Sequence, residues 1–151
     1  MFEKVAKFAK LTGPRKRLFL EAFVTLGIMR AAILTVSFRR LTQTLRHSNG
    51  EIAAEILSDE QLHMAKEIRK AIGMAAGHTL WESACLAQAL TAQRMLQRRG
   101  IPGVFHLGVM RDKDAKEKIK AHAWSKCGDT VVTGDGYKDF TVLSSFSWEG
   151  V

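Results

Sequence analysis

The hydrophobic positions along this chain recur first at helical spacing and later at strand spacing. Ser58 and Gln61 stand three residues apart, as in a capping box, where each side chain satisfies a free backbone N–H group of the other residue. Apolar residues over 62–72 then share one helix face. The pattern predicts a helix of about four turns, which Gly73 and Gly77 interrupt.

A second helix is predicted to begin at Thr79 or at Ser83 and to continue through Leu96. Its end is clearly marked. Gly100 can adopt the left-handed conformation of a C-terminal cap, and Pro102 prevents the helix from continuing. After this point the apolar residues no longer follow a helical period.

Short β-favouring runs make up the rest of the chain. We expect strands at 104–110, at 119–126 and at 130–133, and a last one at 137–143. The dipeptide Gly128-Asp129 has the pattern of a two-residue hairpin turn. Helices followed by antiparallel strands predict an α+β fold.

Residues 18–38 form the most apolar segment, and their length approaches that of a membrane span. Glu21 and Arg30 lie on opposite sides of the predicted helix, so neither side is compatible with lipid throughout. We therefore expect a helix that is buried within the protein and does not cross a membrane. A helix that faces a partner or a membrane surface is the second interpretation.

The polar, turn-forming stretch at 46–50 separates this helix from the remainder of the chain. A chain of 151 residues has room for one domain, or for a small domain with an extension. We expect an N-terminal helical arm at 1–50, which could dock a partner, and a core domain at 51–151.

The formal net charge of +8 favours contact with an acidic partner. The basic residues are scattered and no aromatic stacking motif lies among them, so nucleic-acid binding is not expected. The two cysteines, Cys85 and Cys127, form no CxxC pair, and no secretory signal pattern opens the chain. These features predict a reduced, cytoplasmic protein without a disulfide.

Cys85 falls in the first or second turn of its predicted helix. The positive end of the helix dipole and the unpaired backbone N–H groups favour a thiolate there, which is the nucleophilic form of cysteine. The alternative is a small buried hydrophobic residue, the usual role of a free cysteine between Ala84 and Leu86.

His122 and Asp135 lie at equal distances from the predicted hairpin turn. Directly opposed residues have Cβ atoms about 4.5–5.5 Å apart, close enough for a carboxylate to orient an imidazole that serves as a general base. The alternative is a surface ion pair, which Gly134 and Gly136 could accommodate in a loop as easily as in a strand. Asp129 and Asp139 are reserve candidates for the acid.

Further residues could complete or compete with this site. Trp81, His106 and Trp124 are expected to line it and exclude water, or simply to belong to the core. A metal site built from Cys85, Cys127, His106 and His122 lacks paired-ligand spacing, so we expect neither a metal nor another cofactor.

Several short motifs occur in the order found in the lasso-peptide leader peptidase family, which this chain resembles over nearly its whole length. They are Pro14-Arg15-Lys16-Arg17-Leu18, Glu21-Ala22, Phe38-Arg39-Arg40-Leu41, Cys85-Leu86, Ala89-Leu90, Leu96-x-x-Arg99-Gly100-Ile101-Pro102, Gly108-Val109 and Ala121-His122-Ala123-Trp124. The chain departs from the family at Ser125-Lys126, where a hydrophobic residue and an acid often stand.

The resemblance implies a papain or transglutaminase-like cysteine peptidase core with a triad at Cys85, His122 and Asp135. It implies removal of the leader from a ribosomally synthesised precursor peptide. In split members of the family a separate small protein recognises the leader, and we expect such a partner here. An ATP-dependent macrolactam synthetase would consume the product. The alternatives are a transglutaminase-type acyl transferase and a non-catalytic peptide-binding adaptor.

Overall fold

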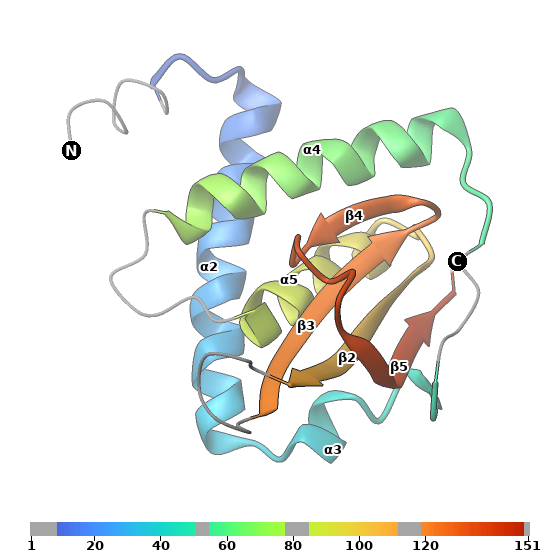
Figure 1. The fold of residues 1–151 in the computed structure, drawn as a ribbon. Helices are drawn as coiled ribbons and strands as arrows, with labels where there is room; N and C mark the ends of the chain where they lie inside the picture. Colours follow the sequence, from blue (N-terminus) through green and yellow to red (C-terminus); the bar gives the residue numbers. More distant parts are fainter. Residues whose placement is uncertain (1–8, 51–54, 78–84, 112–118, 150–151) are drawn as a thin grey trace.

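The computed structural model describes residues 9–50, 55–77, 85–111 and 119–149 (Figure 1). Four helices and five strands are assigned in these ranges. The helices are α2 (Gly13–Thr35), α3 (Phe38–Leu41), α4 (Asp59–Ala76) and α5 (Cys85–Arg98). The strands are β1 (Arg46–Ser48), β2 (Gly103–Arg111), β3 (Ile119–Cys127), β4 (Thr130–Thr133) and β5 (Thr141–Trp148).

The strands form one sheet in the order β1-β5-β2-β3-β4, and every neighbouring pair is antiparallel. Figure 1 shows α5 against one face of this sheet, where it contacts β2, β3 and β4. Helix α4 contacts β4, and α2 packs on α4 and α5. The helices therefore form layers on one side of an antiparallel sheet, which confirms the α+β prediction.

Helix α2 has one buried face and one exposed face. Glu21 forms ion pairs with Arg98, the last residue of α5, and with Arg99 just after it, which fixes the helix against its neighbour. The residues buried between the helices are Leu18, Phe19, Ala22, Thr25, Leu26 and Met29. On the other side the apolar side chains Leu20, Val24, Ile28 and Leu34 are 52%, 57%, 56% and 68% exposed. The prediction of a helix buried within the protein therefore holds for one face of α2 and is wrong for the other.

Helix α2 is long and apolar enough to cross a membrane by length and composition, and a third of its most apolar window is buried inside the protein. A core helix of a soluble protein can pass the same test, so one such helix is weak evidence for a membrane span. The buried face of α2 is covered by α4 and α5 of the same chain.

The predicted capping box at the start of α4 is confirmed. The Gln61 N–H donates to the Ser58 hydroxyl over 3.2 Å, and the Ser58 N–H donates to the Gln61 side chain over 3.0 Å. The predicted interruption at Gly73 is wrong, since the helix continues to Ala76. Gly73 is exposed, so it costs the helix only the weak propensity of a glycine and breaks no packing.

The end of α5 follows the predicted cap. Gly100 has a φ of 69°, and the N–H of Ile101 donates to the carbonyl of Leu96 over 3.0 Å, as in a Schellman motif. The predicted starting points, Thr79 and Ser83, lie outside the described residues, and the described helix starts at Cys85.

The hairpin turn at Gly128-Asp129 is confirmed, because Cys127 pairs with Thr130 across it. The register then shifts between Ser125 and Lys126, so that Ser125 faces Thr133. Beyond Thr133 the chain leaves the ladder.

The last strand differs from the prediction of 137–143. Strand β5 runs from Thr141 to Trp148 and pairs with β2. The preceding residues form a turn in which the Phe140 N–H donates to the Tyr137 carbonyl over 2.9 Å. Both rings pack on Trp124, at centroid distances of 5.4 Å for Tyr137 and 6.3 Å for Phe140. Packing on a large aromatic side chain therefore outweighs their strand propensity.

The stretch predicted as a polar turn contains a short edge strand. β1 pairs with β5, and the His47 ring stacks on Phe146 at 4.8 Å. Figure 1 shows this strand at the rim of the sheet, next to α3. The division into an arm at 1–50 and a core at 51–151 stays a prediction.

Two glycines make room for the buried Trp124. A Cβ on Gly108 would lie 2.7 Å from the Trp124 ring, and one on Gly134 would lie 2.6 Å from the Trp124 Cβ. Gly134 also has a φ of 79°, which favours glycine for a second reason. The Trp124 indole therefore fits against the sheet only because Gly108 and Gly134 have no side chain.

We predict that Gly134→Ala lowers the free energy of unfolding by about 2 kcal/mol or more, from left-handed strain together with overpacking. Gly136→Ala is the matched control, because Gly136 has a φ of 83° but nothing within 4 Å of its would-be Cβ. Urea unfolding of both variants measures the difference. Equal losses would contradict the packing role of Gly134.

Candidate functional site

Cys85 is the first described residue of α5 and packs, half-buried, against the hydrophobic core. It is a free thiol. This end of a helix carries the positive pole of the peptide dipoles, an environment suited to an anion. Residues 78–84 lie outside the described ranges, so the position of Cys85 in the first or second turn of its helix stays a prediction.

The ring of His122, on β3, is oriented by a backbone carbonyl. His122 Nε2 lies 2.9 Å from the Gly134 oxygen. A carbonyl only accepts hydrogen bonds, so Nε2 carries the proton and donates. In the neutral ring Nδ1 then holds the lone pair, and Nδ1 is the atom that could act as a base.

Aromatic rings surround this imidazole. The Trp124 ring is stacked at a centroid distance of 5.7 Å, and the Phe140 ring lies at 5.1 Å. His122 is only half-buried. Its ring is therefore held in place on two sides and remains open to a ligand.

The sheet places three of the candidates on one face. In the β2–β3 ladder His106 is opposite Trp124, and Gly108 is opposite His122, so these side chains share a face. Phe105 and Ala123 occupy the other face, where they belong to the core that Cys85 also contacts.

The thiol and the imidazole are therefore not joined. Among the residues that the structure describes, no hydrogen bond links Cys85 to His122. The edge of β3 next to His122 carries no paired strand in the described ladder, since β4 pairs only with Ser125, Lys126 and Cys127. Cys85 thus packs on the core side of the sheet and His122 lies on the opposite face, and this edge of β3 lies between the two sides.

The prediction that Asp135 lies directly opposite His122 is wrong. The register shift and the end of β4 at Thr133 carry Asp135 out of the ladder. Its carboxylate instead pairs with both terminal nitrogens of Arg69, at 3.2 and 2.9 Å. The Asp135 side chain is 71% exposed. The reserve candidates Asp129 and Asp139 are exposed as well.

His106 is 4% exposed, and its Nδ1 lies 2.7 Å from the Ser145 hydroxyl on β5. Its ring is tilted against Trp124 at 5.5 Å. His106 and Trp124 thus form the buried part of the sheet face that bears His122. Trp81, the third expected lining residue, lies outside the described ranges.

Cys127 differs sharply from Cys85. Its side chain is fully buried, and burial raises the pKa of its thiol from the usual 9.0 to about 12. The folded protein therefore keeps this thiol protonated over the whole physiological range. Within the described ranges, no group of three or more His, Cys, Asp and Glu side chains could hold a metal ion.

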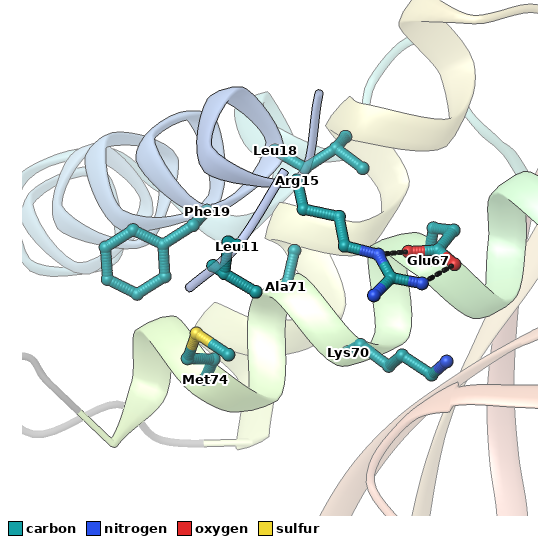
Figure 2. Close-up of a pocket in the computed structure, with 8 residues that line it drawn as sticks. All are labelled: Leu11, Arg15, Leu18, Phe19, Glu67, Lys70, Ala71 and Met74. Carbon is teal, nitrogen blue, oxygen red and sulfur yellow. Dashed lines mark hydrogen bonds and ion pairs between the residues drawn. The ribbon is translucent and has the colours of Figure 1, made fainter. Parts of the chain in front are cut away.

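A cavity of about 240 Å³ lies between α2 and α4 (Figure 2). Figure 2 shows the Arg15–Glu67 ion pair beside its apolar lining. The lining residues are Leu11, Arg15, Leu18, Phe19, Glu67, Lys70, Ala71 and Met74. None of the described candidate site residues is among them, so this cavity is separate from the Cys85 and His122 region.

A family model described as the transglutaminase-like superfamily matches residues 29–145. The chain belongs to the transglutaminase-like superfamily. No curated protein and no solved structure matches it. The matched region contains Cys85, His122 and Asp135. The order of helices followed by strands, and the antiparallel sheet, agree with this transglutaminase-like family.

Sequence reasoning missed two groups in this transglutaminase-like site. One is the Gly134 carbonyl, which holds the imidazole where a carboxylate was expected. The glycines on both sides of Asp135 were a signal in the sequence, because glycine favours turns, and Gly134 has a φ of 79° in the structure. The other is Arg69, which lies 66 residues from Asp135 and carries no local signal.

We predict that a small alkylating reagent modifies Cys85 and leaves Cys127 untouched in the folded protein, from neutral pH to about pH 10. The reason is that Cys127 is buried and keeps its proton until about pH 12. Intact-mass spectra of Cys85→Ala and Cys127→Ala assign the modified thiol. Unfolding should expose Cys127, and equal labelling of both thiols in the folded state would contradict its burial.

Proposed function

We propose that this protein is a cysteine peptidase that removes the leader from a ribosomally synthesised lasso-peptide precursor. The observation that carries the proposal is the His122 ring, whose Nε2 is bound to the Gly134 carbonyl and whose Nδ1 is left as the base. Cys85, the first described residue of α5 in a transglutaminase-like chain, supplies the matching nucleophile.

In the proposed reaction His122 Nδ1 accepts the thiol proton and the Cys85 thiolate attacks the scissile carbonyl carbon. The C–N bond breaks, and the imidazolium returns the proton to the leaving amine. Water then attacks the acyl-enzyme thioester and releases the carboxylate of the leader. The Cys85 backbone N–H is suited to stabilise the oxyanion.

Cys85 and His122 must come together for this chemistry. We propose that substrate binding brings the thiol and Nδ1 into contact past the edge of β3 that carries no paired strand in the described ladder. Catalytic hydrogen bonds often form fully only when substrate is bound, and the proposal places the Cys85–His122 hydrogen bond among them. In this proposal Asp135 acts indirectly. Its ion pair with Arg69 helps to hold residues 131–135, the segment that contains it.

The proposed substrate and partners follow from the resemblance of the motifs. A separate small protein would recognise the leader, and an ATP-dependent macrolactam synthetase would use the freed amino terminus of the product. The proposed location is the cytoplasm, where both cysteines stay reduced.

We predict that Cys85→Ala lowers precursor cleavage at least about 10³-fold, because it removes the nucleophile. Mass spectrometry of the precursor, incubated with enzyme and recognition protein, measures the cut. We expect the precursor and the recognition protein to be encoded in the reading frames next to the one for this chain, and the assay uses those two. Cys127→Ala is the matched control and should cleave normally. Full cleavage by the Cys85→Ala protein would exclude the proposed nucleophile.

A transglutaminase-type acyl transferase would use the same thiol and imidazole. The two reactions differ in the second step, since hydrolysis gives a free carboxylate and transfer gives an amide with an added amine. Product masses in the presence of an amine therefore distinguish them.

The exposed face of α2 supports a second candidate function, a non-catalytic adaptor that binds a protein through this helix. Leu20, Val24 and Ile28 recur one helical turn apart and are all more than half exposed. Such a stripe is typical of an interaction surface. Under the peptidase proposal the same stripe docks the leader-recognition protein.

We predict that Ile28→Asp weakens binding of the recognition protein at least about tenfold, because it places a charge on the apolar stripe. Isothermal titration calorimetry measures the affinity. Leu143→Asp is the matched control, since Leu143 on β5 is 53% exposed, close to the 56% of Ile28. Unchanged affinity for Ile28→Asp would remove α2 as the docking element. An adaptor without activity would also bind, but its Cys85 would alkylate no faster than free cysteine.

A further inference from the structure

We infer that Arg69 is a positioning residue for His122, a role that rests on the proposed function. It acts through the segment that supplies the Gly134 carbonyl. Arg69 belongs to α4, whereas His122 belongs to β3, and no contact between the two side chains is required.

Arg69 binds this segment on both sides of Gly134. Its Nη1 donates to the Val131 carbonyl over 2.6 Å and to the Asp135 carboxylate over 3.2 Å. Its Nη2 donates to the other carboxylate oxygen over 2.9 Å. One guanidinium therefore fixes the positions of residues 131 and 135, and Gly134 lies between them. A planar guanidinium suits this task, because its donors have a fixed geometry.

The held segment must be placed accurately because it approaches β3 very closely. A Cβ at position 134 would lie 2.5 Å from the Ala123 carbonyl oxygen and 2.6 Å from the Trp124 Cβ. The ladder no longer guides the chain here, since β4 ends at Thr133. The Gly134 carbonyl reaches His122 Nε2 at 2.9 Å only if this approach is kept.

The ion pair itself is too exposed to be important for global stability. The Arg69 side chain is 41% exposed and that of Asp135 is 71% exposed, and exposed pairs contribute little to folding. A purely structural role therefore predicts nearly unchanged behaviour when Arg69 is replaced. A positioning role predicts a large change at His122 with little change in melting temperature.

The test uses Arg69→Met, which keeps the apolar stem, and Arg69→Lys, which keeps the charge but loses the paired contact. Two quantities are measured on the full chain. The first is the tautomer of the neutral His122 ring, from its ¹⁵N chemical shifts. The second is kcat and KM for precursor cleavage with the recognition protein present.

We expect Arg69→Met to reduce the share of the Nε2–H tautomer and to lower kcat about 10- to 100-fold, with KM little changed. Arg69→Lys should recover part of both effects. The matched control is Arg15→Met, which removes a comparable two-bond pair between Arg15 of α2 and Glu67 of α4. This variant should change neither quantity.

The two proposals fail in different ways. If the tautomer and kcat of both Arg69 variants equal those of the wild type, the positioning role is overturned even though the protein cleaves. If the wild type does not cleave but its tautomer responds to Arg69→Met, the positioning of the ring stands and the peptidase proposal fails. Should Arg69→Met not fold, the comparison of Arg69→Lys with Arg15→Lys decides the question.

Discussion

The packing of one indole ring organises the face of the sheet that bears His122. Trp124 is 2% exposed and lies against Tyr137, Phe140 and His106. Burying a ring of this size contributes roughly 4–6 kcal/mol before entropy is counted. Residues 137–140 form a turn that packs on the ring and do not extend β5, so the strand begins only at Thr141.

Because the segment after β4 must cover this ring, its backbone passes directly against β3. The passage brings the Gly134 carbonyl to the imidazole and carries the Asp135 carboxylate toward α4. A backbone carbonyl can set the tautomer of a histidine as a carboxylate can, but it adds no full negative charge to stabilise the imidazolium. The face therefore combines an oriented imidazole with a carboxylate that is held elsewhere.

The N-terminal helix joins the core and also presents a surface. One face of α2 packs on α4 and α5 and forms ion pairs through Glu21. The opposite face leaves a stripe of apolar side chains in solvent. The apolar run at 18–38 in the sequence thus contains residues of both the buried and the exposed face.

Local patterns in the sequence were enough to determine the fold class, the capping box before α4, the Schellman end of α5 and the Gly128-Asp129 hairpin. Each of these depends on residues only a few positions apart, where spacing and backbone preference act directly. The positions of Cys85 and His122 on their elements followed for the same reason.

Tertiary structure alone decided the partner of His122, the partner of Asp135 and the start of β5. A register shift beside Ser125, the close approach of Gly134 to β3 and the reach of Arg69 from α4 set these contacts. They join residues from different elements through packing around Trp124, and no local sequence pattern encodes a distance across the sheet.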